Sequence, residues 1–430
     1  MSTLSLLERY GKGTIAGSRV SSLVCRACGH EMPLIPATSC DRCFGPLEVQ
    51  YDYAEVARRV SRESIAAGPP TIWRYHHLLP LEDDAVEARV SLGEGFTPLI
   101  HARNLGAQLG LRNLYLKNDT LNPTGSFKDR VVSVAVSWAR QQGLTTVACA
   151  STGNLANAVA AYAAHAGLQA VVLIPADLEP AKILATSVYR PTLIAVQGNY
   201  DDVNRLCVEL ADSVDWGFCN INLRPFYAEG SKTLTFETAE QLGWRLPDEI
   251  VIPVASGCQF VRHRKAAGEL IDLGLVEPGS RLPRFTGAQA AGCGPVATAF
   301  AAGADTITPV RPNTIARSIA IGNPSDGADT VRIARATGGV VESVSEEELV
   351  EGIELLAAAE GIFAETAGGV TVAVLRKLAL AGRWNGDETV VAYITGHGLK
   401  TADAVSGRLP APEPVAPSLR AFRERFAPLL

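Results

Sequence analysis

One lysine near the start of a predicted helix could do covalent chemistry. Lys128 follows a turn built on Pro123 and Gly125, and the residues after it, Val131–Gln142, have the pattern of a helix. A helix N-terminus carries partial positive charge, which lowers the pKa of a lysine there and favours the neutral amine that attacks a carbonyl carbon. The alternative is a solvated lysine paired with Asp129, and on spacing alone that arrangement is the more common.

Three further turns between a predicted strand and the next segment carry polar groups. Ser151–Asn154 offers hydroxyls and free N–H groups for an anion, although a simple helix cap uses the same residues. The small residues of Ala255–Gln259 can cradle a phosphate with backbone N–H groups, or can serve packing alone. In Thr395–Lys400 a hydroxyl at the strand's end can contact a buried heterocycle, whereas the lone His397 has the ordinary interpretation of a structural residue.

Four of the nine cysteines form two C-x2-C pairs, Cys25 with Cys28 and Cys40 with Cys43, separated by eleven residues. This spacing predicts a tetrahedral zinc site with four thiolate ligands, structural rather than catalytic because no position is left open. Reduced cysteines without metal are the alternative. The odd number of cysteines argues against a disulfide framework.

Composition limits the function classes. The chain has 430 residues, of which 47% are hydrophobic, and a net charge of −6. These values predict a globular protein of two or three domains and argue against a dominant nucleic-acid surface. No apolar run is long enough to span a membrane, and Met1–Arg9 lacks the pattern of a signal peptide. We therefore expect a cytoplasmic protein.

Apolar runs alternate with Ala-rich helical stretches from about residue 93 to 400, which predicts an open, mostly parallel α/β sheet with helices on both faces. The predicted strands are Thr145–Ala150, Ala170–Pro175, Thr192–Gln197, Gly217–Asn220, Glu249–Val254, Arg284–Ala288 and Thr389–Ile394. The predicted helices between the first four strands are Leu155–Ala166, Ala181–Tyr189 and Asp201–Val214. Residues 51–90 are expected to form exposed helices anchored by Trp73–Tyr75, and residues 406–430 a tail with a short helix at Leu419–Phe426.

Taken together, these motifs resemble the fold-type II pyridoxal-phosphate enzymes and, within that group, the threonine synthase family. The matching segments are Gly93–Leu99, Asn122–Arg130, Ser151–Asn154, Glu229–Thr233, Gly287–Ala290, Ile321–Pro324 and Thr395–Lys400. The four-cysteine ribbon is similar to that of some longer members of this family. The resemblance implies two open, mostly parallel α/β domains with the active site between them, plus the small N-terminal zinc ribbon.

The domain boundaries expected from this resemblance divide the chain into five parts. These are 1–50 for the arm and ribbon, 51–130 for linking helices and the first part of the large domain, 131–232 for the smaller α/β domain, 233–405 for the large cofactor-binding domain and 406–430 for the tail.

The resemblance also implies roles for individual residues. Lys128 would be the catalytic residue and the covalent attachment point of pyridoxal phosphate. The other implied cofactor-binding residues are Asn154, Ala255, Ser256, Gly257, Cys258, Gln259 and Thr395. The implied substrate-binding residues are Ser126, Ser151, Thr152, Asn222, Arg224 and Lys232, with Arg224 and Lys232 as the candidates for a leaving phosphate. An isolated surface ion pair is the alternative for Arg224.

The implied reaction converts O-phospho-L-homoserine and water to L-threonine and phosphate in a homodimer. A cysteate-synthase-like β-replacement on O-phosphoserine, a threonine dehydratase-like deamination and a binding module on an inactive scaffold are the alternatives. The sequence departs from the wider family in the loop Ala255–Gln259, which has one glycine where many relatives have several. The basic run Phe260–Lys265 behind this loop is expected either to be a solvated helix face or to help hold the phosphate.

Overall fold

The computed structural model describes residues 18–151, 153–176, 180–198 and 200–429, and its largest element is a six-stranded sheet. In spatial order the strands are β12 (Val341–Val344), β11 (Arg284–Ala290), β10 (Glu249–Pro253), β13 (Thr389–Ile394), β5 (Asn113–Asn118) and β4 (Leu99–His101). Neighbouring strands are parallel except β4 and β5, which are antiparallel. The central strands are buried almost throughout, so this sheet is covered on both faces.

Strand periodicity sends alternate side chains of β13 into two separate cores. The helices around this sheet are α4 (Arg103–Leu109), α10 (Lys232–Gln241), α11 (Cys258–Asp272), α12 (Pro295–Ala301), α13 (Gly327–Thr337), α14 (Glu346–Glu360) and α15 (Thr366–Leu380). Val390 and Ala392 lie in the core formed with α14 and α15, whereas Val391 and Tyr393 lie in the core formed with α10, α11, α12 and α13 on the other face. Short 3-10 segments lie at η3 (Asp119–Leu121), η4 (Ala291–Cys293) and η5 (Arg317–Ile319).

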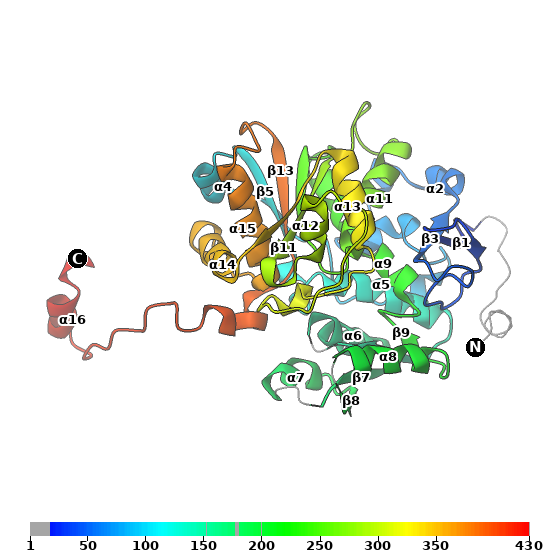
Figure 1. Ribbon diagram of the computed structural model, residues 1–430, viewed down its shortest axis with the longest axis horizontal. Helices are drawn as coiled ribbons and strands as arrows, with labels where there is room; N and C mark the ends of the chain where they lie inside the picture. Colours follow the sequence, from blue (N-terminus) through cyan, green and yellow to red (C-terminus); the bar gives the residue numbers. More distant parts are fainter. Residues whose placement is uncertain (1–17, 152, 177–179, 199, 430) are drawn as a thin grey trace.

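A second sheet of four parallel strands lies beside the first, at the bottom of Figure 1. Its spatial order is β8 (Thr192–Val196), β7 (Gln169–Pro175), β6 (Thr146–Ala150) and β9 (Gly217–Phe218). The helices associated with it are α5 (Lys128–Gln141), α6 (Asn154–Ala166), α7 (Pro180–Ser187) and α8 (Tyr200–Ala211), and α9 (Arg224–Glu229) leads back to the larger sheet. Small alanines fill α6, which lets this helix lie close against α5 and β7.

The N-terminal segment forms a separate three-stranded antiparallel sheet, drawn in dark blue in Figure 1. Its strands are β1 (Val20–Cys25), β2 (Glu31–Met32) and β3 (Leu47–Tyr51), in the order β2-β1-β3. We call residues 18–51 the ribbon. Its apolar side chains, among them Leu23, Ile35 and Val49, join the core that also contains α5, α6 and α9, so the ribbon is packed onto the body.

The segment after the ribbon is helical, as predicted. It forms α2 (Tyr53–Arg59), α3 (Arg62–Ala66), η1 (Ile72–Leu78) and η2 (Ala85–Ala88). Trp73 and Tyr75 are buried, which confirms the predicted anchor. Towards the C-terminus, η6 (Gly398–Val405) is the last element of the body. A tail with α16 (Leu419–Arg425) and η7 (Ala427–Leu429) extends away from it (Figure 1).

The predicted strands and helices all occur, with small shifts of their ends. The shifts reach three residues: the helix predicted for Asp201–Val214 ends at Ala211, and the helix predicted from Val131 begins at Lys128. Strand β9 ends at Phe218 rather than Asn220 because the chain turns there, with Ile221 N–H donating to the Phe218 carbonyl at 3.0 Å. Strands β4, β5 and β12 were not predicted from the sequence. Among the described residues, no helix is both long and apolar enough to cross a membrane.

Candidate active site

Two of the sequence motifs are hydrogen-bonded to each other at the carboxyl end of β13. The backbone N–H of Phe127 donates to the Thr395 carbonyl at 2.9 Å, and the N–H of His397 donates to the Gly125 carbonyl at 2.9 Å. Gly125 has a φ of 75°, a left-handed conformation that favours glycine. This pairing fixes Lys128 and Thr395 on the same side of the sheet.

Lys128 is the first residue of α5 and lies in a partly buried, apolar environment. Its Nζ lies 4.5 Å from the ring centroid of Phe127 and 5.9 Å from that of Tyr227. Burial lowers its pKa, and the nearby Cys258 and Glu365 oppose this effect. Within the described part of the chain, Nζ has no hydrogen-bond acceptor and no ion-pair partner, so its lone pair is available for chemistry once the proton leaves.

Asp129 does not pair with Lys128. Its carboxylate accepts hydrogen bonds from the Thr124 N–H at 2.8 Å and the Thr124 hydroxyl at 2.7 Å. Burial raises the pKa of Asp129 to about 7. The surface ion pair that the sequence left open is therefore absent from this structure.

Asn154, the first residue of α6, reaches the site through a glutamate that the sequence motifs did not include. Its Nδ2 donates to Glu365 Oε2 at 2.9 Å, and the N–H of Glu365 donates to the Gly396 carbonyl at 2.9 Å. A Cβ on Gly396 would lie 2.4 Å from Glu365 Oε1, so a larger residue there would displace this carboxylate. Burial raises the pKa of Glu365, while Asn154, Lys400 and Lys128 lower it. A single glutamate at a helix start has no sequence signal that would have identified it.

The loop Ala255–Gln259 has the geometry of a phosphate cradle. It joins β10 to the 15-residue helix α11, and Gly257 at its centre has a φ of 88°. The backbone N–H groups of Ser256, Gly257 and Gln259 have no acceptor among the described residues, and that of Cys258 donates to Ser256 Oγ at 3.3 Å. Free N–H groups at a helix N-terminus bind phosphate, so this loop fits the phosphate of pyridoxal phosphate even with a single glycine.

The predicted substrate-binding residues have different surroundings. Ser126 is buried and its Oγ accepts from the Lys128 N–H at 3.4 Å, and Ser151 Oγ accepts from the Gly153 N–H at 3.3 Å. Thr152 lies outside the described residues. Asn222 is buried, with its side-chain amide bonded to the backbone of Phe218 and Trp216, so it shapes the turn after β9.

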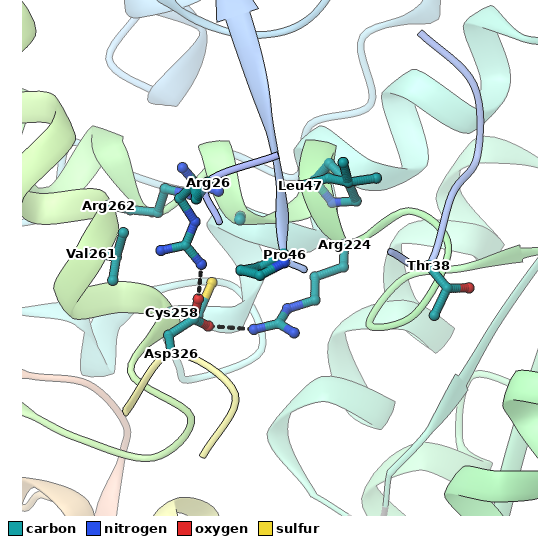
Figure 2. Close-up of a pocket in the computed structure, with 11 residues that line it drawn as sticks. Arg26, Thr38, Pro46, Leu47, Arg224, Cys258, Val261, Arg262 and Asp326 are labelled. Carbon is teal, nitrogen blue, oxygen red and sulfur yellow. Dashed lines mark hydrogen bonds and ion pairs between the residues drawn. The ribbon is translucent and has the colours of Figure 1, made fainter. Parts of the chain in front are cut away.

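Arg224 lies at the start of α9 and lines a cleft together with Cys258 of the loop Ala255–Gln259. Its Nη2 donates to Ser325 Oγ at 2.6 Å and forms an ion pair with Asp326, as Figure 2 shows for the Asp326 contact. The side chain is 29% exposed, and its Nε and Nη1 have no partner among the described residues. The cleft beside it is lined by Arg26, Arg224, Cys258, Val261, Arg262 and Asp326, among others.

Lys232 is placed differently. Its side chain is fully buried, and Nζ lies 2.8 Å from Glu229 Oε2 and 2.9 Å from Glu269 Oε1, over the Tyr51 ring. Two carboxylates already neutralise this ammonium, and no surface of it faces solvent. The structure does not bring Lys232 together with Arg224.

The basic run Phe260–Lys265 is not a solvated face, because its charged side chains Arg262 and Lys265 bind the ribbon. Arg262 forms an ion pair with Glu48 at 2.7 Å, and Lys265 Nζ donates to the Val49 carbonyl at 2.7 Å. Both partners belong to the ribbon strand β3, so this part of α11 is where the ribbon docks.

The four predicted metal-ligating cysteines converge. Their sulfur atoms lie within 4.8 Å of one another, with Cys43 Sγ 3.4 Å from Cys25 Sγ and 3.3 Å from Cys28 Sγ. Cys28 and Cys40 are 3.8 Å apart, and all four are free thiols. Four sulfurs at these separations surround a point that suits a tetrahedral metal ion.

Comparison with known proteins agrees with this site. Residues 90–396 match the family of pyridoxal-phosphate dependent enzymes. The chain is 39% identical to the threonine synthase of Methanocaldococcus jannaschii over 88% of this chain and 93% of that protein. It is 38% identical to the threonine synthase of Methanosarcina acetivorans, over 94% of this chain and 98% of the relative.

Solved structures agree on the fold. The processed form of threonine deaminase isoform 2 from Solanum lycopersicum matches with a TM-score of 0.59 at 20% identity, covering 73% of this chain and 84% of that one. Diaminopropionate ammonia lyase from Escherichia coli matches with a TM-score of 0.60 at 17% identity, covering 75% and 90%. The chain belongs to the pyridoxal-phosphate-dependent enzyme family and, within it, to the threonine synthases.

Proposed function

We propose that this protein converts O-phospho-L-homoserine and water to L-threonine and inorganic phosphate, as a carbon–oxygen lyase acting on phosphate. The observation that carries the proposal is Lys128, a desolvated lysine without a carboxylate partner among the described residues, beside a loop of free N–H groups. The extended similarity to threonine synthases supports the choice of substrate.

The residues that would hold the cofactor surround Lys128. Lys128 Nζ would carry the aldehyde carbon, Asn154 would face the ring's 3′ oxygen, the N–H groups of Ala255–Gln259 would hold the phosphate, and Thr395 would face the pyridine nitrogen. When bound, pyridoxal phosphate supplies an electron sink for the electrons left when a proton leaves the substrate's Cα.

The protein's own groups handle protons and charge. The Lys128 amine is the group that would take the proton from Cα, and burial lowers its pKa, which favours the neutral form that this role requires. A second proton leaves Cβ, the C–O bond to the γ phosphate breaks, and phosphate departs with the bonding electrons. Water then adds its oxygen to Cβ and protons return to Cα and Cγ, so atoms and charge balance to threonine and phosphate.

The leaving phosphate needs a separate anion site, and Arg224 supplies it in this proposal. The Nε and Nη1 atoms of its guanidinium have no partner among the described residues, so each can donate a charge-assisted hydrogen bond to a phosphate oxygen. Ser126, Ser151 and Thr152 are retained as candidates for the substrate carboxylate and phosphate, and Asn222 as the residue that shapes the turn before Arg224. Lys232 is left out, because both its burial and its two carboxylates oppose contact with substrate.

We further propose that Cys25, Cys28, Cys40 and Cys43 bind one structural zinc ion. Four soft sulfur donors within 4.8 Å of one another suit this ion. They would fill all four coordination positions of a tetrahedral zinc ion and leave none open for catalysis. A homodimer located in the cytoplasm completes the proposal. Metal analysis and light scattering test the first two of these points.

The first experiment is an assay of purified protein loaded with pyridoxal phosphate. With O-phospho-L-homoserine we expect equal amounts of threonine and phosphate, and with O-phospho-L-serine plus sulfite we expect none of the β-replacement product. Borohydride should fix the cofactor on the peptide containing Lys128, and Lys128→Ala should lose both the yellow colour and at least about 10²–10⁴-fold of the rate.

Other outcomes would contradict the proposal. Activity only with phosphoserine and sulfite would move the function to β-replacement, and 2-oxobutanoate formed from threonine would move it to deamination. A colourless protein that takes up no cofactor would overturn the enzyme itself. Lys400→Met, a change of another lysine near Glu365, serves as the control and should keep the label on Lys128.

A further inference from the structure

The ribbon reaches across the cleft to the carboxylate that holds Arg224. Arg26 lies directly after the zinc-ligand candidate Cys25, at the end of β1, and its side chain is only 14% exposed. One terminal nitrogen of Arg26 forms an ion pair with Asp326 Oδ1, and the other bonds Asp329 Oδ2 at 2.5 Å. Arg26 and Arg224 thus bind opposite oxygens of the same buried Asp326 carboxylate (Figure 2).

Asp326 also touches the cofactor loop through its backbone. Its N–H donates to the Ser256 carbonyl at 2.8 Å, and its carbonyl accepts from Thr330 Oγ1 at 2.9 Å. A Cβ on Gly257 would lie 2.7 Å from the Asp326 carbonyl oxygen. One residue therefore joins the ribbon, the predicted substrate arginine and the predicted phosphate cradle.

The sharing of Asp326 sets how many donors Arg224 keeps. Because Arg26 occupies Oδ1, Asp326 meets Arg224 through Oδ2 and the single nitrogen Nη2. Without Arg26, both carboxylate oxygens could turn to Arg224, in the paired geometry that arginine and carboxylate favour. A carboxylate bound to Arg224 through both oxygens would occupy a second nitrogen of the guanidinium and neutralise its charge. Arg224 would then bind the substrate's phosphate group less strongly.

We propose that Arg26 of the ribbon is a positioning residue for the substrate's phosphate group, acting on Arg224 through Asp326. The ribbon is held in place for this task from a second side, where the Ala37 N–H donates to the Asn222 carbonyl at 2.8 Å, two residues before Arg224. The inference rests on the proposed function for the identity of the phosphorylated substrate. It assigns to the ribbon a part in substrate recognition in addition to folding.

The test compares Arg26→Ala with Arg42→Ala. Arg42 lies in the other cysteine pair, is exposed, and its side chain makes no hydrogen bond or ion pair with any described residue. For Arg26→Ala we expect KM for O-phospho-L-homoserine to rise about tenfold with kcat changed less than about twofold, as for a displaced binding group. Arg42→Ala should match the unmodified protein.

Two further measurements separate positioning from general damage. Titration of holoenzyme with inorganic phosphate, followed by calorimetry, should give about tenfold weaker binding for Arg26→Ala with an unchanged cofactor spectrum and zinc content. Arg26→Lys restores one ion pair to Asp326 without the forked geometry, so its KM should lie about threefold above that of the unmodified protein.

Arg224→Ala distinguishes a failure of this inference from a failure of the proposed function. We expect it to raise KM by about 10- to 150-fold, the value of a hydrogen bond to a charged group. If Arg224→Ala has this effect and Arg26→Ala behaves like Arg42→Ala, the inference is wrong while the proposed function stands. If the unmodified protein makes no threonine, the proposed function fails, and equal phosphate affinity of the Arg26→Ala and Arg42→Ala proteins would then overturn the inference as well.

Discussion

At the scale of single residues, environment rather than residue type separates the active groups from their neighbours. Lys128 and Asp129 are adjacent in sequence, yet Lys128 faces the aromatic rings of Phe127 and Tyr227 while Asp129 turns back to Thr124. Glu365 is unremarkable in sequence but buried in the structure beside Asn154. Chemistry at this site depends on which charges are left without a partner.

Glu365 provides a test at this scale. Glu365→Ala removes the acceptor that orients the Asn154 amide, so we expect about tenfold weaker binding of pyridoxal phosphate, the cost of losing a hydrogen bond to a charged group. Absorbance titration of the cofactor-free protein measures this affinity. Glu365→Gln keeps an oxygen acceptor for Asn154 and should retain affinity close to that of the unmodified protein. Equal affinity for all three proteins would contradict this role.

At the scale of elements, α11 combines two tasks, one at its N-terminus and one along its middle turns. Its N-terminus presents the loop Ala255–Gln259, and its middle turns dock the ribbon through Arg262 and Lys265. Between Arg262 and Lys265, His263 lies fully buried against α10, where its Nδ1 shares a 2.6 Å hydrogen bond with Thr235 Oγ1. A neutral histidine in this position links two helices, and it makes the stability of the folded protein sensitive to acid.

The pH dependence of stability should reveal this histidine. Burial lowers the pKa of His263 to about 3, and Arg130 adds to the effect. The unfolded chain binds a proton at this side chain below about pH 6.5 and the folded chain does not, so its contribution to stability is complete above that pH and is lost as the pH falls. Through this one side chain, the free energy of unfolding falls by up to about 1.4 kcal/mol for each pH unit of acidification.

Denaturant unfolding between pH 5 and 6.5 measures this slope. His263→Asn should reduce it by nearly one proton, whereas the exposed His165→Asn should leave it unchanged. Parallel stability curves for the unmodified and His263→Asn proteins would show that the histidine is charged in the folded state.

The ribbon is the second element with a separate test. Replacing Cys25 and Cys28 by serine removes two thiolates, and we expect loss of zinc and a lower Tm because metal binding contributes to folding. The chemistry at Lys128 should continue, with kcat within about twofold and a raised KM through Arg26. Serine at the buried but isolated Cys293 is the control. A protein that keeps its Tm while losing kcat would contradict a structural role for the metal.

At the scale of the whole molecule, a buried charge cluster ties the ribbon to the body. Lys232 of α10 meets Glu229 and Glu269, and Tyr51 of β3 donates to Glu229 at 2.9 Å. Neighbouring cations lower the pKa of Glu229 although burial opposes them, so the cluster is charged at neutral pH. Four elements, β3, α9, α10 and α11, meet at these side chains.

Lys232→Met should therefore act on stability rather than on substrate recognition. It leaves two buried carboxylates without their shared cation, which costs about 3–5 kcal/mol in the free energy of unfolding. Chemical denaturation measures this loss, and the double variant Lys232→Met with Glu269→Gln should recover part of it. Folded Lys232→Met protein should keep its KM, and a KM raised without any loss of stability would instead place Lys232 at the substrate.

The sequence allowed much of this architecture to be predicted, because parallel strands are buried on both faces and appear as short apolar runs between helices. The strands that were missed have a weaker pattern. β4 and β12 are edge strands of three and four residues, and β5 contains Lys117, whose charge is matched by Glu237 at 2.7 Å far along the chain. The predicted domain boundaries remain predictions.

The site was predictable to the extent that its residues lie in local motifs. The turns around Lys128, Asn154 and Gly257 each have a sequence pattern of their own. Arg262 pairs with Glu48 and Glu229, and Asn154 binds Glu365. These partners are far apart in the sequence and meet only when the chain folds. The basic run of α11 was misinterpreted for this reason, since its counter-charges were invisible in sequence.

The contact between Arg26 and Asp326 has a consequence for synthesis of the chain. The two residues are 300 positions apart, whereas the four cysteines fall within 18 positions. At roughly 5–20 residues per second, the ribosome would complete the cysteine cluster about 15–60 s before it delivers Asp326. All four ligands of the proposed zinc site are therefore synthesised before Asp326, the carboxylate that Arg26 binds, which lies in the last third of the chain.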